Sequence, residues 1–400
     1  MTGVSIAEAR LREAEWRSRA ETQAILAVLD GAEGRTRAVG GVVRDTIMGR
    51  HRDNPDIDLA TELTPAEVTA RAQSAGIAVY PTGIAHGTVT LKLGDTLAEV
   101  TTLRHDVETD GRHAVVSFGA DWAEDAARRD FTINALYAHA DGTLYDPLGG
   151  LPDCLEARVR FIGDAAARIA EDGLRVYRFF RFSASHGGEH FDAAGASACK
   201  AAAGKLGHLS AERIGAEMLR MLALPRITAT LRAMSRIGLL DISEETLQAL
   251  RNYERQVGSP SVAGRLALLL CDQPAELLQS SWRLSNELIK TAIAVRAAAA
   301  LLRDLQTNEA IYRYRPYLGD GLDVAAVQAG WGEAGKVAMA EQLSLASALP
   351  AFPVSGHDLI AAGIAAGPLL GEALSRLERD WIDSGFALDR QALLSRLRAS

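Results

Sequence analysis

The decisive stretch of this chain runs from Gly40 to Ala60 and reads GGVVRDTIMGRHRDNPDIDLA. Its two glycines end a short apolar strand, Ala38–Val39, and an apolar-periodic helix pattern follows them. Glycines in such a turn let backbone N–H groups approach a phosphate closely, and a helix N-terminus adds a partial positive charge. The first half of the stretch therefore predicts a phosphate cradle between a strand and a helix.

The second half of the stretch alternates acidic and apolar residues, as a half-buried strand does. Because strand side chains repeat with a period of two, Asp56 and Asp58 are expected on one face of that strand. Two carboxylates beside a phosphate cradle suit a pair of divalent cations about 3.5–4 Å apart for phosphoryl displacement. A lone Asp-x-Asp is more often a turn or a cap, so the inference depends on its order and spacing after GGVVRD. Asp53 precedes the strand, and we interpret it as a turn residue.

Length and composition limit the class of protein. A chain of 400 residues predicts two or more domains. It contains no run of about 18 apolar residues, so we expect no membrane span. Residues 1–30 are interrupted by Glu and Arg, which predicts an amphipathic helix packed on the following domain rather than a signal peptide. The three scattered cysteines indicate reduced thiols and a cytoplasmic protein.

The net charge of −8 argues at first against a nucleic-acid partner. However, residues 1–150 alone carry a net charge of −8, while residues 151–225 and 226–400 are close to neutral. The acidic excess therefore lies where the carboxylates are proposed to hold metal, and a local basic face remains open elsewhere. Any RNA binding must use dispersed Arg side chains and the shape of the RNA.

The pattern changes along the chain from mixed to helical. Strands are predicted at Ile77–Tyr80, Gly87–Leu93 and Leu97–Leu103, before a polar stretch from Arg104 to His113 without periodicity. Such a stretch predicts a functional or mobile loop. Arg128–Ala138 is then predicted to be helical, and almost every segment beyond residue 151 has a helical pattern.

A second motif, Arg128–Tyr137, reads RRDFTINALY. On a helix, Arg128 and Arg129 would lie near the N-terminal end, where the helix dipole disfavours cations. This placement suggests that an anion such as a triphosphate supplies the compensating charge. Taken alone, the motif fits a solvated pair of surface arginines better.

A third motif, Glu171–Phe182, reads EDGLRVYRFFRF. On one helix, Arg175, Arg178 and Arg181 follow each other along one face, with Asp172 in the first turn. The phenylalanines between them suggest arginines held against a core and directed into a cleft. An Asp offers acceptors and an Arg offers donors, so the pair can recognise the Watson–Crick edge of a nucleotide. A helix-stabilising ladder of salt bridges is the open alternative.

These three motifs, in this order, resemble those of the class II tRNA nucleotidyltransferase/poly(A) polymerase family. The likeness extends from about Val39 to Glu217 and includes LSAERIGAE at Leu209–Glu217. The segment DPLGGLPD at Asp146–Asp153 is similar to the bacterial CCA-adding members. The resemblance implies an α+β fold, with a polymerase-β-like nucleotidyltransferase head built on a mixed or antiparallel sheet and an all-α neck, body and tail. The expected divisions are an N-terminal helix (1–30), the head (31–150), the nucleotide-recognition neck (151–225) and the tRNA-binding body and tail (226–400).

The resemblance also implies roles for individual residues. Asp56 and Asp58 would be catalytic and would ligate Mg²⁺ in a two-metal site, with Glu99 as a candidate third carboxylate whose structural role is equally open. The residues implied to contact the nucleotide are Gly40, Gly41, Arg44, Arg128, Arg129, Asp172, Arg175, Arg178 and Arg181. Asp172 and Arg175 would select CTP and ATP, and the 104–113 loop would allow the switch to A addition. Gly173 departs from the family and, inside a helix, costs up to about 1 kcal/mol.

The expected function is therefore template-independent addition of CCA to the 3′ end of tRNA from CTP and ATP, without an obligate protein partner. A poly(A) polymerase and a CC-adding enzyme are the related alternatives, and the lack of a basic C-terminal tail and the intact 104–113 stretch count against them. A non-catalytic RNA-binding protein is a remoter alternative, because neither carboxylate is lost.

Overall fold

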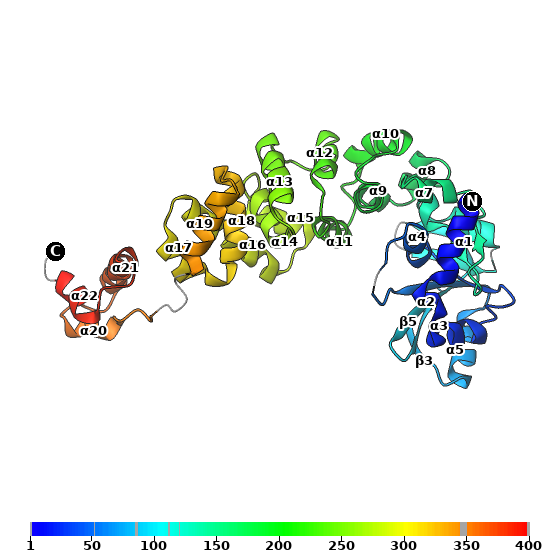
Figure 1. Cartoon of the computed structure of the whole chain (residues 1–400), viewed down its shortest axis with the longest axis horizontal. Coiled ribbons are helices and arrows are strands. Elements are labelled where there is room, and N and C mark those ends of the chain that lie inside the picture. Colours follow the sequence, from blue (N-terminus) through cyan, green and yellow to red (C-terminus); the bar gives the residue numbers. More distant parts are fainter. Residues whose placement is uncertain are drawn as a thin grey trace. The chain divides into compact units, whose positions relative to one another are not determined.

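The computed structural model describes residues 2–51, 53–84, 87–110, 113–119, 121–344 and 350–397. Figure 1 follows its elements from the N-terminus in blue to the C-terminus in red. The chain forms two compact units. The first comprises Met1–Glu217 with Arg236–Leu239, and the second comprises Met218–Ser235 with Leu240–Ser400. The finer division at 30, 150 and 225 stays a prediction.

The described strands of the first unit form a seven-stranded mixed sheet in the order β3-β4-β5-β2-β1-β8-β9. β2 and β5 are parallel, and the other neighbours in the sheet are antiparallel. The strands are β1 (Thr36–Val39), β2 (Ile57–Thr61), β3 (Ala78–Gly83), β4 (Thr88–Leu93), β5 (Thr96–Thr102), β8 (Tyr137–Ala138) and β9 (Leu144–Tyr145). The α+β class, the mixed sheet and the predicted strands are confirmed.

Helices lie before, between and after these strands. They are α1 (Gly3–Glu13), α2 (Glu15–Ser18), α3 (Ala20–Val28), α4 (Gly41–Ile47), α5 (Pro65–Ser74), α6 (Trp122–Ala127), α7 (Leu151–Leu155), α8 (Ala165–Glu171), α9 (Leu174–Ser185), α10 (Ala193–Ala202) and α11 (Ala211–Leu222). The segment predicted as one N-terminal helix is thus divided among α1, α2 and α3, and its packing on a separate head domain stays a prediction. Trp16 Nε1 donates to Thr46 Oγ1 of α4 at 2.9 Å.

Two predictions for the first unit are wrong. The stretch from Arg104 is no irregular loop, because β6 (Arg104–Asp110) and β7 (His113–Phe118) form an antiparallel hairpin. Gly111 and Arg112, at its turn, lie outside the described residues. Residues 128–138 form no α-helix either: α6 ends at Ala127, a 3₁₀ turn covers Thr132–Asn134, and β8 follows.

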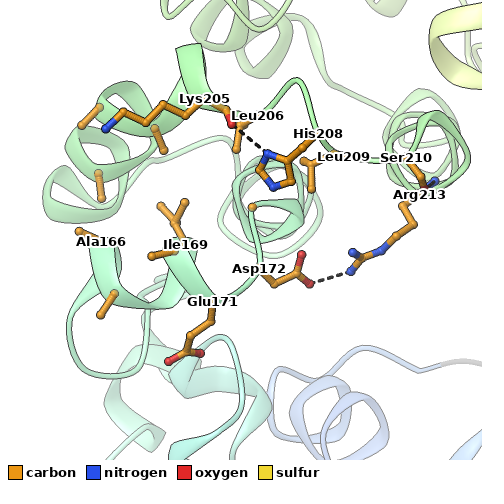
Figure 2. Close-up of a pocket in the computed structure, with 16 residues that line it drawn as sticks. Ala166, Ile169, Glu171, Asp172, Lys205, Leu206, His208, Leu209, Ser210 and Arg213 are labelled. Carbon is orange, nitrogen blue, oxygen red and sulfur yellow. Dashed lines mark hydrogen bonds and ion pairs between the residues drawn. The ribbon is translucent and has the colours of Figure 1, made fainter. Parts of the chain in front are cut away.

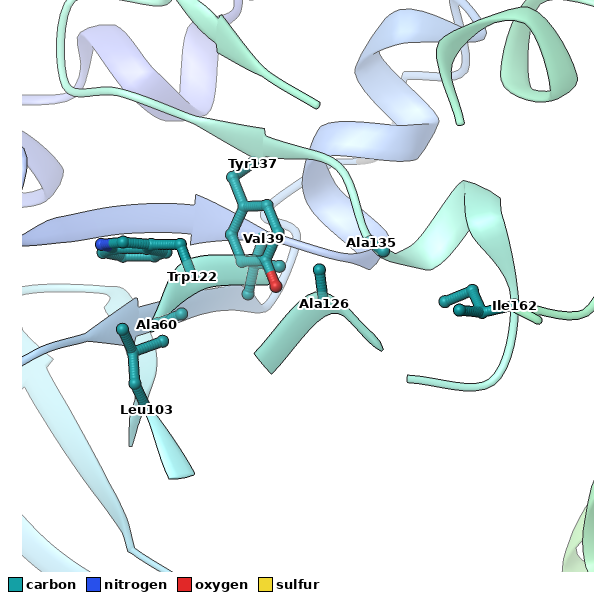
Figure 3. Close-up of a cluster of buried hydrophobic side chains, with 8 residues drawn as sticks. All are labelled: Val39, Ala60, Leu103, Trp122, Ala126, Ala135, Tyr137 and Ile162. Atoms are coloured by element: carbon teal, nitrogen blue, oxygen red, sulfur yellow. The ribbon is translucent and has the colours of Figure 1, made fainter. Parts of the chain in front are cut away.

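The second error has a tertiary cause. β8 completes the sheet beside β1, with Val39 paired to Tyr137. Tyr137 and Ala135 are also buried in a cluster with Val39, Ala60, Leu103, Trp122, Ala126 and Ile162 (Figure 3). A free sheet edge and an apolar layer above it are long-range features, and they override the local helical pattern.

The second unit is helical, as predicted. Its helices are α12 (Thr228–Arg236), which the boundary between the units cuts, α13 (Glu244–Gln256), α14 (Val262–Leu269), α15 (Ala275–Trp282), α16 (Asn286–Arg303), α17 (Thr307–Tyr314), α18 (Leu318–Ala329), α19 (Glu333–Ser344), α20 (Gly356–Ala361), α21 (Pro368–Asp383) and α22 (Arg390–Arg396). Trp381 and Leu377 of α21 centre a buried cluster with Val354, Leu359, Ile382 and Leu393. None of the described helices combines the length and apolar character needed to cross a membrane.

Candidate active site

The glycine turn between β1 and α4 brings three site residues together. Gly40 has φ +70°, a conformation that favours glycine, and it precedes the first residue of α4. A Cβ at Gly40 would lie 3.7 Å from Nη1 of Arg129 and 3.9 Å from Oδ2 of Asp58. The absence of a side chain at Gly40 therefore leaves space in which the guanidinium of Arg129 and the carboxylate of Asp58 approach the backbone.

The two predicted carboxylates share a cavity. Asp58 lies on β2 and Asp56 immediately precedes that strand, so the period-two argument applies to both. Both line a cavity of about 410 Å³, together with Gly41 of α4 and Trp16 of the N-terminal helices. Glu99 of β5 is paired in register with Asp58 but is not among the lining residues.

Asp58 is the carboxylate with the more unusual electrostatics. Its burial, followed by the negative charges of Glu99 and Asp56, raises its pKa to about 6, although Arg129 and Arg44 oppose the shift. Within the described ranges, no hydrogen bond or ion pair compensates this carboxylate. A partly buried, uncompensated carboxylate at a cavity is typical of a site that receives a cation.

The described residues contain no group of three or more His, Cys, Asp or Glu side chains arranged to hold a metal ion. Two carboxylates nevertheless fit Mg²⁺, which proteins commonly bind through one or two carboxylates, with waters and substrate phosphates as the remaining ligands. The assignment of Glu99 as a third ligand stays a prediction.

Arg44 is held from both sides in the interior. It is 5% exposed, and its guanidinium donates to Asp45 Oδ1 at 2.8 Å and to Asn134 Oδ1 at 2.6 Å. Asp45 also contacts Nε2 of His186 at 3.0 Å. Burial raises the pKa of Asp45, but the hydrogen bond to His186 and the charge of Arg44 outweigh it and lower that pKa to about 2. Burial lowers the pKa of His186 to about 4, so near neutral pH an uncharged imidazole supports Asp45.

Arg128 and Arg129 share one buried carboxylate. Asp125, which is 1% exposed, accepts from Arg128 Nη2 at 2.5 Å and from Arg129 Nη2 at 3.1 Å. It also accepts from the hydroxyl of Tyr137 at 2.8 Å. The two arginines follow α6 at its C-terminal end, where the helix dipole favours cations. The argument from a misplaced charge was therefore wrong, because Asp125 supplies the compensation.

The EDG segment is a junction between two helices rather than the start of one. Glu171 ends α8, Asp172 and Gly173 connect, and α9 begins at Leu174. Asp172 Oδ1 accepts from the backbone N–H of Leu174 at 3.0 Å and so caps α9. Arg175 donates instead to Glu171 Oε2 at 2.5 Å and to the carbonyl of Arg168 at 2.8 Å. The predicted Asp172 and Arg175 are thus neighbours with separate side-chain partners.

The later arginines of α9 are held by two buried acids. Arg178 donates to Asp130 Oδ2 at 2.7 Å, and Arg181 donates to Glu217 of α11. Glu217 Oε1 also lies 3.8 Å from Arg178 Nη1. The neighbouring Phe179, Phe180 and Phe182 are buried. Glu171 and Arg175 thus form an i,i+4 ion pair, but it joins the end of α8 to α9 instead of stabilising one helix, and the partners of Arg178 and Arg181 come from other parts of the chain.

The sequence reasoning missed the residues that hold these arginines, Asp125, Asp130, Asn134 and Glu217. It also missed Arg213, which donates to Asp172. Asn134 connects two groups, because its Oδ1 accepts from Arg44 and its Nδ2 donates to Asp130 Oδ1 at 2.9 Å. A usable signal existed, since Asp130 and Asn134 are polar positions inside an apolar motif. Likewise, Arg213 and Glu217 are spaced four apart in LSAERIGAE and share a helix face.

Comparison with known proteins identifies the family of the chain. Residues 36–160 match the family model of the poly A polymerase head domain, and residues 190–251 match the model described as a probable RNA and SrmB-binding site of polymerase A. A mitochondrial CCA tRNA nucleotidyltransferase 1 of Danio rerio is 34% identical over 385 residues, which cover 91% of this chain and 87% of that protein. A CCA-adding enzyme of Limosilactobacillus fermentum is 32% identical over 386 residues, covering 92% and 94% of the two chains.

A solved structure extends the agreement to three dimensions. The Bacillus stearothermophilus CCA-adding enzyme in complex with CTP superposes with a TM-score of 0.78 at 27% identity, covering 95% of this chain and 98% of that one. The fold of the head and of the helical region therefore agrees over nearly the whole length. The chain belongs to the family of CCA-adding tRNA nucleotidyltransferases and is a nucleotidyltransferase enzyme.

Proposed function

We propose that this chain adds CCA to the 3′ end of tRNA, using CTP and ATP without a nucleic-acid template. The observation that carries the proposal is the meeting of Gly40, Asp58 and Arg129 beside the cavity that Asp56 also lines. It supports nucleotidyl transfer because acidic oxygen ligands, a backbone turn without side chains and an arginine converge there. Relatives named for CCA addition, and a related structure with CTP, support the choice of substrates.

Asp56 and Asp58 are the residues that would hold Mg²⁺. The metal, when bound, would lower the pKa of the attacking 3′-hydroxyl and neutralise the triphosphate. The 3′-oxygen of the tRNA bonds to the α-phosphorus of the nucleotide, the bond to the β-phosphate oxygen breaks, and pyrophosphate leaves. Arg129, held by Asp125 and by the carbonyl of Asn134, would face the triphosphate at the glycine turn. Positioning and charge neutralisation account for most of the acceleration in such transfers.

Asp172 and Arg175 would provide nucleotide selection. Cytosine and adenine both carry an exocyclic amine, a donor, where uracil and guanine carry a carbonyl oxygen. A fixed carboxylate accepts from the amine and repels the carbonyl, so one acidic side chain can favour C and A over U and G. Arg178 and Arg181, held by Asp130 and Glu217, would contribute positive charge on the same helix.

We also propose that the protein is located in the cytoplasm. Cys154, Cys199 and Cys271 are free thiols, and the first two are buried. Free thiols suit a reducing compartment, which supports a cytoplasmic location.

One assay tests the proposal. Purified protein is given a tRNA that ends at the discriminator base, with labelled CTP and ATP offered separately and together. We expect two C residues from CTP alone, then one A and a stop when both nucleotides are present. A long A tail from ATP alone would favour the poly(A) polymerase, CC without A would favour a CC-adding enzyme, and no incorporation would favour an RNA-binding protein.

A further inference from the structure

The second oxygen of Asp172 has a partner that the site described so far does not use. Oδ2 accepts from Nη2 of Arg213, on α11, at 2.7 Å, while Oδ1 caps α9. Figure 2 shows Arg213 reaching back to Asp172 at the edge of a cavity of about 900 Å³, which both residues line. The two carboxylate oxygens are therefore fixed by two different elements of the neck.

The pair is not explained by stability. The Asp172 and Arg213 side chains are 27% and 39% exposed, and an ion pair of that exposure contributes about 0–1 kcal/mol. Arg213 is also the third residue of α11, a first-turn position where the helix dipole disfavours a cation. Arg213 therefore lowers the stability of its own helix and adds little to the stability of the fold, so its position needs another explanation.

We propose that Arg213 is a positioning residue for nucleotide selection, because it fixes the direction in which Asp172 presents its remaining lone pairs. An ionised carboxylate has about four acceptor sites, so Oδ2 can bind Arg213 and still accept the exocyclic amine of cytosine or adenine. Among the described residues, loss of Arg213 leaves the carboxylate with its contact to Leu174, about which it can rotate. This inference rests on the proposed function, and it names which second residue sets the preference for C and A.

The same helix supports both parts of the nucleotide-facing surface. One turn after Arg213, Glu217 engages Arg181 and lies near Arg178. LSAERIGAE therefore holds the acid at the start of α9 and the arginines along it. Arg213 is the member of this set whose partner is the base-reading group, so its removal should change selectivity more than the rate of transfer.

Steady-state kinetics with CTP, ATP, UTP and GTP test this inference in the full-length protein. For Arg213→Ala we expect the kcat/KM ratios of CTP over UTP and of ATP over GTP to fall about tenfold. The kcat with CTP should stay within about threefold of the parent, because the groups around the reacting phosphate are untouched. Arg213→Lys, which keeps a donor and the charge, should recover most of the lost selectivity.

A double-mutant cycle separates positioning from a structural effect. In an Asp172→Ala background, Arg213→Ala should change selectivity less than about twofold, because the group on which it acts is gone. The matched control is Arg71→Ala, which breaks an ion pair with Asp30 of 2.6 Å at 36% and 24% exposure in another part of the same unit. It should leave selectivity unchanged while costing a similar small shift in the melting temperature.

The inference is overturned if Arg213→Ala keeps the parental selectivity, if its effect multiplies with that of Asp172→Ala, or if Arg71→Ala reproduces it. Should Arg213→Ala not fold, Arg213→Gln in the same assay decides, because it keeps length and polarity but loses the charge. A parent protein that adds neither C nor A overturns the proposed function and this inference with it. A selective parent with an equally selective Arg213 variant overturns this inference alone.

Discussion

The carboxylates around β2 and the arginines of α9 are both groups of like charges, but only the arginines are bonded to side chains of opposite charge. Asp58 is raised in pKa to about 6, and none of the described side chains bonds to it. In contrast, Arg178 and Arg181 are each bonded to a buried acid. The acidic region leaves its charge for a ligand to neutralise, whereas the basic region is neutralised internally.

This difference assigns separate tasks to the two regions. An uncompensated carboxylate destabilises the folded state, and a bound cation removes that cost by neutralising its charge. An arginine held by a fixed acid loses little freedom when a ligand binds, so it serves orientation. Substitutions in the first region should therefore affect chemistry most, and those in the second should affect stability and selection.

The largest expected effect is that of Asp58→Ala. It removes a ligand for the proposed metal, so incorporation of labelled CTP into tRNA should fall at least about 1,000-fold, with tRNA binding retained. A gel assay and a binding titration measure the two quantities. Asp53→Ala, which removes an exposed acid just before the same strand, is the control and should stay active. Retained activity in Asp58→Ala would refute the metal assignment.

The second substitution acts on the compensated region. Glu217→Ala removes a 2%-exposed acid shared by Arg178 and Arg181, and it should lower the free energy of unfolding by about 3–5 kcal/mol. Denaturant unfolding measures the loss. Glu212→Ala, at an exposed position of the same helix, should cost less than about 1 kcal/mol. Equal losses of unfolding free energy from both variants would mean that Glu217 is not needed to neutralise Arg178 and Arg181.

The third prediction uses the raised pKa of Asp58. The folded chain binds this proton up to about pH 6, whereas the unfolded chain loses it near pH 3.8, so ionisation of Asp58 destabilises the fold as pH rises through that window. Asp58→Asn should therefore be more stable than the parent at pH 8 by about 1–3 kcal/mol, and equally stable below pH 4. Mg²⁺ should raise the melting temperature of the parent but not of the variant. A variant less stable than the parent at pH 8 would contradict the uncompensated state of Asp58.

The smallest effect concerns Gly173. The sequence suggested that this glycine weakens the interior of a helix, but it lies at the junction before α9. A Cβ there would lie 2.8 Å from Cδ2 of Leu206, a movable side chain. Gly173→Ala should thus destabilise by less than about 1 kcal/mol in thermal unfolding. A gain of about 1 kcal/mol, as expected inside a helix, would contradict the junction.

Local pattern predicted the elements whose residues interact with near neighbours. The alternation around Asp58 gave β2. Asp56, Asp58 and Gly40 were identified in advance for the same reason, because turn and strand geometry fix them within one short segment.

The sequence by itself determined the paired carboxylates and the row of arginines, since these follow from periods of two and 3.6 residues. The glycine turn follows from the backbone freedom of glycine, and the fold class came from the resemblance of the motifs to a known family. Only the tertiary structure decided what neutralises the charges whose partners are distant in sequence. Asp130 reaches Arg178 across 48 positions, and Arg213 reaches Asp172 across 41. Such partners, like the strand made from residues 137–138, are set by long-range packing, and no local period encodes them.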